Sequence, residues 1–75
     1  MINSMQSKMA RAALGWGVRE LANVASVSAD TITRLERGEE LMPRTAAAIR
    51  SAFEKAGIEF INDDRSHGVV RLRKG

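Results

Sequence analysis

The sequence has no cysteine and few aromatic residues, with two phenylalanines, one tryptophan and no tyrosine. Without cysteine, neither a disulfide framework nor a thiolate metal site can form, and this fits a reducing cytosol. No run of 18 apolar residues is present, so the sequence predicts no transmembrane span. The segment 1–10 also lacks the apolar stretch of a signal peptide. We therefore expect a cytoplasmic protein that does not enter a membrane.

Groups suited to catalysis are equally scarce. His67 is the single histidine, and the adjacent carboxylates at 39–40 and 63–64 fall in expected loops, with no reason to place them around a substrate. A glycine-rich phosphate loop is missing, and a metal site would need more soft ligands than the chain has. The sequence therefore predicts no enzyme, no catalytic or metal site and no cofactor.

The 75 residues are expected to form one small domain with a marginal core, which makes help from a second subunit unsurprising. With 44% hydrophobic and 28% charged residues, the composition is that of a folded domain. Net charge is +2 over residues 1–37, −3 over 38–64 and +4 over 65–75. Basic ends suggest a polyanionic partner such as nucleic acid, although a basic tail often only adds solubility.

Capping residues and apolar periodicity predict four helices, at about 4–14, 18–25, 29–37 and 45–56. The expected N-caps are Ser4, Ser28 and Thr45. Met5, Met9, Ala12 and Ala13 mark the expected apolar face of the first helix, and Ile49, Ala52, Phe53 and Ala56 that of the fourth. Gly15, Gly38 and Gly57 are expected to end three of the helices.

The C-terminal part has a different pattern. Residues 58–62 and 69–73 are short and rich in β-branched or aromatic side chains, with turn residues between them. This predicts a β-hairpin, which must pack on the helices or pair with another chain because a lone hairpin is barely stable. Phe60 and Ile61 would point to opposite faces, and a second copy of the chain is the simple candidate to cover the outer face.

The helix expected at 29–37 has two distinct faces. At 100° per residue, Ile32 and Leu35 lie inward, and the opposite face carries Asp30, Thr33, Arg34 and Arg37. Arginine can grip a guanine edge or a phosphate with two parallel hydrogen bonds, and threonine can donate to a phosphate or contact a thymine methyl group. The alternative is an ordinary solvated helix face. The preceding helix favours a DNA-contacting face, because it carries the small Ala22 and is joined by a turn of three residues.

The stretch "VRELANVASVSADTITRLERG", residues 18–38, resembles the Cro/repressor-type (XRE-like) helix-turn-helix family of phage and bacterial transcription regulators. The match lies in "RLERG" and in the family's apolar positions, supplied by Leu21, Ala22, Ala25, Val27, Ile32 and Leu35. It extends over roughly residues 5–56. The resemblance implies a lambda-repressor-like four-helix domain, an internal ion pair between Arg11 and Glu36, and an arginine near the DNA backbone at Arg44.

Two positions depart from that family. Ser26 stands where a glycine is usual, in a turn that often requires a left-handed backbone. Val18 stands where a glutamine often contacts DNA, so that contact is lost or moved, with Arg19 as the replacement. The following loop, 38–41, is acidic where many relatives are basic, which should weaken nonspecific binding.

The expected DNA-contacting residues are Arg19, Ser28, Ala29, Asp30, Thr33, Arg34, Arg37 and Arg44. For several of them a second explanation stays open. Ser28 could act as a helix cap alone, and Asp30 could favour the helix dipole rather than accept from cytosine. Ala29 could lie against a thymine methyl group. Trp16 is expected in the core, with exposed stacking as the alternative.

The sequence therefore predicts a mainly α protein with two parts, a helix-turn-helix domain at 1–57 and a hairpin at 58–75 that could mediate dimerisation. The expected function is sequence-specific binding of double-stranded DNA by a homodimeric transcriptional regulator, probing the major groove with helix 29–37 and acting as a repressor. The alternative is a protein-interaction module, such as an antitoxin or a partner of the transcription machinery, with weak DNA binding. The acidic middle segment, 38–64, is its main support.

Overall fold

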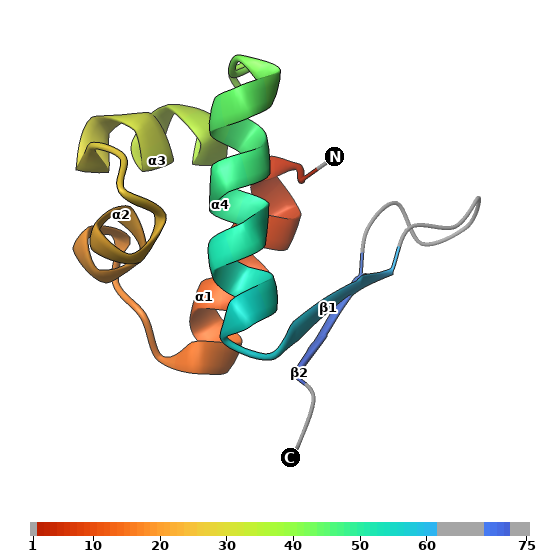
Figure 1. Ribbon diagram of the computed structural model, residues 1–75. Helices are drawn as coiled ribbons and strands as arrows, with labels where there is room; N and C mark the ends of the chain where they lie inside the picture. Colours follow the sequence, from red (N-terminus) through yellow and green to blue (C-terminus); the bar gives the residue numbers. More distant parts are fainter. Residues whose placement is uncertain (1, 62–68, 73–75) are drawn as a thin grey trace.

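The computed structural model describes residues 2–61 and 69–72, and over this part the chain is mainly helical, as the sequence predicts (Figure 1). The elements are α1 (Ser4–Leu14), α2 (Val18–Ala25), α3 (Ala29–Glu36), α4 (Pro43–Lys55), β1 (Ile58–Ile61) and β2 (Val69–Leu72). None of the described helices has both the length and the apolar composition needed to cross a membrane. The expected turn at 63–68, with His67 and the carboxylate pair 63–64, lies outside the described residues.

The N-cap of α1 is Asn3, so the prediction of Ser4 was wrong. The Gln6 N–H donates to Asn3 Oδ1 at 2.8 Å, and the Asn3 N–H donates to Gln6 Oε1 at 3.0 Å. This reciprocal capping box satisfies two backbone donors, which a cap at Ser4 would not do. At the other end, Gly15 takes the left-handed conformation, with φ 69°, and stops the helix as predicted.

The turn between α2 and α3 consists of Ser26, Val27 and Ser28. Ser26 has φ 59° and is the one non-glycine residue with a positive φ in the described part of the chain. Ser28 Oγ accepts from the Thr31 N–H at 3.1 Å, which confirms the predicted cap of α3. α3 ends at Glu36, one residue earlier than predicted, because Arg37 is its C-cap.

Helix α4 begins at Pro43, and the prediction of Thr45 as its cap was wrong. Proline suits the first helical position because its missing N–H would have no partner there and its φ is already helical. Met42 is therefore the N-cap, although it makes no side-chain capping bond.

Helix α4 stands between the α2–α3 pair on one side and the hairpin on the other (Figure 1). The buried side chains of one core come from all four helices and β1, with Leu21, Ile32, Ile49 and Phe53 fully enclosed. The predicted apolar stripe of α4 is therefore largely confirmed.

The predicted apolar face of α1 was mostly wrong. Met5, Ala12 and Ala13 are exposed, whereas Gln6, Ser7 and Ala10 are buried. The buried polar side chains are tolerated because each has a hydrogen-bond partner: Gln6 closes the capping box and Ser7 donates to Glu36. Apolar periodicity could not reveal these polar partners.

The three aromatic side chains form one cluster that ties the hairpin to the helices. The rings of Trp16 and Phe53 stack with centroids 5.8 Å apart, and Phe53 meets Phe60 edge-on at 6.0 Å. Trp16 is half-buried against the core, in line with the expectation that it is a core residue. Geometry of this kind stabilises aromatic pairs beyond the area that they bury.

The hairpin packs on the helices through both strands, β1 against α4 and β2 against α1. Its antiparallel register pairs Ile58 with Leu72 and Phe60 with Val70. Directly opposed residues share a face, and Ile58, Phe60 and Val70 all pack on the helical core. The predicted hairpin is thus present, and most of its inner face is covered by the helices, whereas Leu72 at the end of that face is 43% exposed.

Candidate functional site

The candidate site is built on α3, which is anchored by its inner face. Ile32 is fully buried and Leu35 is 5% exposed, so these two side chains fix the rotation of the helix on the core. This rotation was predicted, and it leaves Asp30, Thr33 and Arg37 exposed and Arg34 half-exposed. A face with two guanidinium groups and a hydroxyl therefore points outward from a rigidly held helix.

An ion pair at the end of α3 adds a second anchor. Arg11 on α1 donates to Glu36 through Nε at 2.8 Å and through Nη2 at 2.6 Å, and Ser7 Oγ donates to the same carboxylate at 2.6 Å. Arg11 Nη1 also donates to the Trp16 carbonyl oxygen at 3.2 Å. The predicted pair is confirmed, and it joins α1, α3 and the connector before α2.

The environment of Glu36 sets its charge state. Burial alone would raise the pKa of this carboxyl, but the hydrogen bonds from Arg11 and Ser7 outweigh it and hold the pKa below its ordinary value. The hydrogen bonds that Arg11 donates to Glu36 also raise the pKa of Arg11. Both groups are therefore charged at neutral pH, and the end of α3 is held to α1 by an ionised, bidentate contact.

Glu39, directly after α3, contacts both outward arginines. Arg34 Nε donates to Glu39 Oε1 at 3.1 Å, and Arg37 donates to Oε2 through Nε at 3.0 Å and also through Nη2. These hydrogen bonds, first from Arg34 and then from Arg37, hold the pKa of Glu39 below its ordinary value. The sequence showed the acidic loop but not this contact, whose only signal was the short separation of Glu39 from Arg34 and Arg37.

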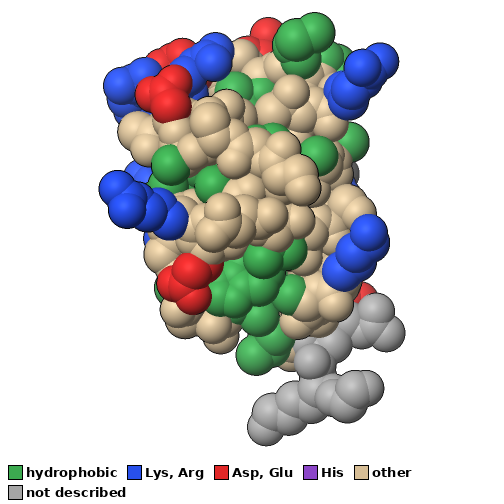
Figure 2. All heavy atoms as spheres, turned by 60° about the vertical axis from the view of Figure 1, so that its left-hand side comes forward, with side chains coloured by type: hydrophobic (Ala, Val, Ile, Leu, Met, Phe, Trp, Pro, Cys, Tyr) green, Lys and Arg blue, Asp and Glu red, His purple; other side chains and the backbone are tan. Residues whose placement is uncertain are grey.

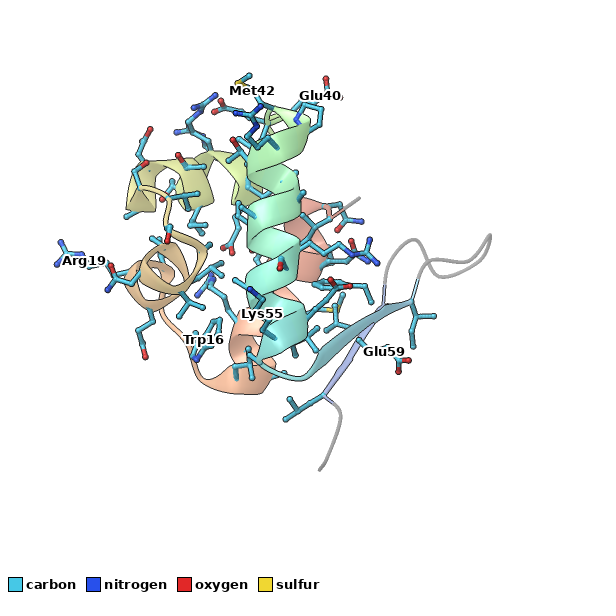
Figure 3. The ribbon with its side chains drawn as sticks, viewed as in Figure 1. Trp16, Arg19, Glu40, Met42, Lys55 and Glu59 are labelled. Carbon is cyan, nitrogen blue, oxygen red and sulfur yellow. The ribbon has the colours of Figure 1, made fainter. Side chains whose placement is uncertain are left out.

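The remaining predicted residues lie at helix ends around α3. Arg19 is exposed in the first turn of α2 and points away from the body of the molecule (Figure 3). Arg44 is exposed in the first turn of α4, the end of that helix where Met42 and Glu40 are labelled (Figure 3). Arg34 and Arg37 are the pair that the structure brings into one cluster, through Glu39.

The other four predicted residues, Ser28, Ala29, Asp30 and Thr33, lie at the N-cap or in the first two turns of α3. The Ser28 and Thr31 hydroxyls lie 2.8 Å apart, and Thr33 Oγ1 donates to the Ala29 carbonyl oxygen at 3.2 Å. Ala29 packs partly on the core, so only part of its methyl group is open to solvent. Asp30 is exposed in the first turn of α3, where a carboxylate favours the helix dipole.

The face that carries α2 and α3 has basic side chains along both edges, with an uncharged area and a hydrophobic cluster between them (Figure 2). At its upper left, acidic side chains lie directly against basic ones. Positive and negative side chains therefore share the margins of this face, and its centre is uncharged.

A hollow of about 260 Å³ opens beside this region, between the start of α1 and the loop that follows α3. Ile2, Leu35, Leu41 and Ala46 give it apolar walls, and Glu39 and Glu40 stand among its lining residues. No group of three or more potential metal ligands occurs within residues 2–61 and 69–72. The hollow therefore offers an apolar surface with acidic neighbours, and Glu39 stands both at its edge and against the arginines of α3.

In comparisons with known proteins, no family model, no curated protein and no solved structure matches the chain.

Proposed function

We propose that the protein binds double-stranded DNA sequence-specifically as a transcriptional regulator, with α3 in the major groove. The observation that carries this proposal is the division of α3 into a locked inner face, held by Ile32, Leu35 and Glu36, and an outer face with Arg34 and Arg37. Arginine forks held on a rigid helix are suited to guanine edges and phosphates.

The α2–α3 unit supports the proposal as a helix-turn-helix of the Cro/repressor type. Its turn has three residues, Ala22 and Ala25 are buried on α2, and Ser26 takes the left-handed conformation expected where the Cro/repressor family usually carries glycine. In this arrangement α3 lies in the groove, and Arg19, Ser28 and Arg44 hold the phosphate backbone. Ala29, Asp30 and Thr33 then lie close to base edges.

Binding as a homodimer completes the proposal. One domain of this size buries limited surface on DNA, and a second copy would supply affinity and a second half-site about 34 Å away, or a multiple of that distance. The hairpin is the proposed contact between copies, because its inner face is used by the helices and its outer face carries Ile61. Ile61→Lys should abolish the dimer in sedimentation equilibrium and leave the circular dichroism spectrum unchanged.

The test of DNA binding is a selection from random duplexes, followed by sequencing of the retained pool. The native chain should enrich a two-fold symmetric motif, and Arg34→Ala should lose the enrichment. Lys55→Ala is the matched control, since it also removes one positive charge, but from an exposed side chain near the end of α4 (Figure 3). No enrichment by a native chain that is folded by circular dichroism would refute the proposal.

A second candidate function is supported by the hollow beside α3. Its apolar walls lie near Met42, which is 74% exposed, and near the acidic Glu39 and Glu40. An exposed apolar side chain bordered by carboxylates suits a protein partner with a basic rim. In that case, affinity for DNA would be weak and insensitive to Arg34→Ala, whereas Met42→Asp would abolish capture of the partner.

A further inference from the structure

Glu39 is held in a defined place relative to α3 by its backbone as well as its side chain. Its N–H donates to the Arg34 carbonyl oxygen at 3.0 Å, and Gly38, with φ 95°, provides the left-handed turn that brings the chain back. The position of the carboxylate is thus set by the C-terminal turn of α3 and does not depend on a long, mobile loop.

The hydrogen bonds to Glu39 use particular edges of the two guanidinium groups. Arg34 uses Nε alone, and Arg37 uses Nε and Nη2. Among the described residues, none accepts a hydrogen bond from the two terminal nitrogens of Arg34 or from Nη1 of Arg37. Glu39 thus takes the Nε side of each guanidinium group, and N–H donors at the tip of each group are left for a guanine edge.

This arrangement has two physical consequences for a DNA-contacting face. First, one carboxylate cancels half of the charge of two arginines, which weakens their nonspecific attraction to phosphate, because that attraction is electrostatic. Second, each guanidinium group is oriented before DNA arrives, so less side-chain freedom is lost when it pairs with a base edge. Both effects favour the correct sequence over an arbitrary one.

We propose that Glu39 is a specificity-determining residue, which orients Arg34 and Arg37 for base edges and reduces their affinity for nonspecific DNA. This inference rests on the proposed function and assigns a role to a residue of the α3–α4 loop that itself contacts no base. Glu39 acts through the two arginines, so it is a positioning residue.

The experiment compares Glu39→Gln with Glu40→Gln, measuring affinity for the selected duplex and for a scrambled duplex. Both variants raise the net charge by one, and both glutamates are exposed in the same loop, but Glu40 forms no ion pair with any described residue. Glu39→Gln should tighten binding to the scrambled duplex and lower the specificity ratio about tenfold, on the scale of one bidentate base contact. Glu40→Gln should leave the ratio within about twofold, because it alters only the general electrostatic attraction.

Two results would overturn the inference. One is an unchanged specificity ratio in Glu39→Gln. The other is an equal loss of the specificity ratio in both variants, which would show that net charge alone causes the effect. A measurement without DNA separates this inference from the function on which it rests. In NMR spectra, the Nε–H signals of Arg34 and Arg37 should shift and exchange faster with water in Glu39→Gln but not in Glu40→Gln. Unchanged signals would refute the contact even if DNA binding holds. Altered signals in a chain that prefers no duplex would refute the proposed function, and the inference with it.

Discussion

Arg11 and Glu36, 25 positions apart in the sequence, form a bidentate ion pair that joins α1 to the end of α3. The Glu36 side chain is only 9% exposed, and Ser7 occupies a further acceptor site on its carboxylate. The pair holds the end of the outward-facing helix against the body of the protein. Loss of this ion pair should therefore lower the stability of the fold first, and affect binding only through the position of α3.

Replacing Glu36 with glutamine should lower the free energy of unfolding by about 2 kcal/mol, since charge-assisted hydrogen bonds are lost and Arg11 is left without its counter-charge. For a domain of this size, the melting temperature should fall by roughly 10 °C. Glu54→Gln is the matched control, because it removes the exposed pair with Arg50, and it should cost less than about 0.5 kcal/mol. Urea denaturation of both variants measures the free energies of unfolding. An equal loss in the two variants would show that the Arg11–Glu36 pair contributes no more to stability than an exposed ion pair.

The stability should also depend on pH through Glu36. The pKa of its carboxyl is lower in the folded than in the unfolded chain, so its contribution is fully present above the ordinary glutamate pKa, about 4.3. The contribution is lost as the pH falls through the lower pKa of the folded state. The difference in unfolding free energy between the native chain and Glu36→Gln should thus narrow between pH 5 and pH 3, and a constant difference would contradict this assignment.

Ser26→Gly should stabilise the protein by about 0.5–1 kcal/mol, because glycine adopts the left-handed conformation without the steric cost that serine bears there. Ser28→Gly is the matched control at φ −77°, where no such strain exists and a capping oxygen is lost. The control should lower stability slightly. Thermal unfolding followed by circular dichroism would distinguish them, and a loss of stability in Ser26→Gly would show that the turn holds serine without strain.

If the protein binds DNA as proposed, affinity should fall steeply from about 50 to 200 mM salt. Arg44→Ala should weaken binding to all sequences alike and reduce the slope of log K against log salt by about 0.9, as expected for one lost phosphate contact. Arg34→Ala should instead relax the preference at one base position. Fluorescence anisotropy over a salt series would measure both, with Lys55→Ala as the control, and a flat salt response would argue against phosphate contacts.

Several features of the fold were predictable because their signals are local. Gly15 ended α1 and Ser28 capped α3, since each acts through backbone groups within a few residues. The inward face of α3 followed from the spacing of Ile32 and Leu35 alone. The start of α4 was missed although Pro43 was a valid signal for a first helical residue, because Thr45 was preferred for its hydroxyl.

The sequence by itself thus determined that the described residues form four helices, roughly where each lies, and which side of α3 turns outward, because these features depend on neighbouring residues. It did not determine the starts of α1 and α4 or the buried face of α1. Only the tertiary structure decided that Ser7 is buried on Glu36 and that Trp16, Phe53 and Phe60 form one cluster. It also decided that Glu39 accepts hydrogen bonds from the Nε atoms of Arg34 and Arg37. These contacts depend on the path of the chain in space and on side-chain rotamers, and a hydrogen bond or ring contact of that kind leaves no periodic trace in the sequence.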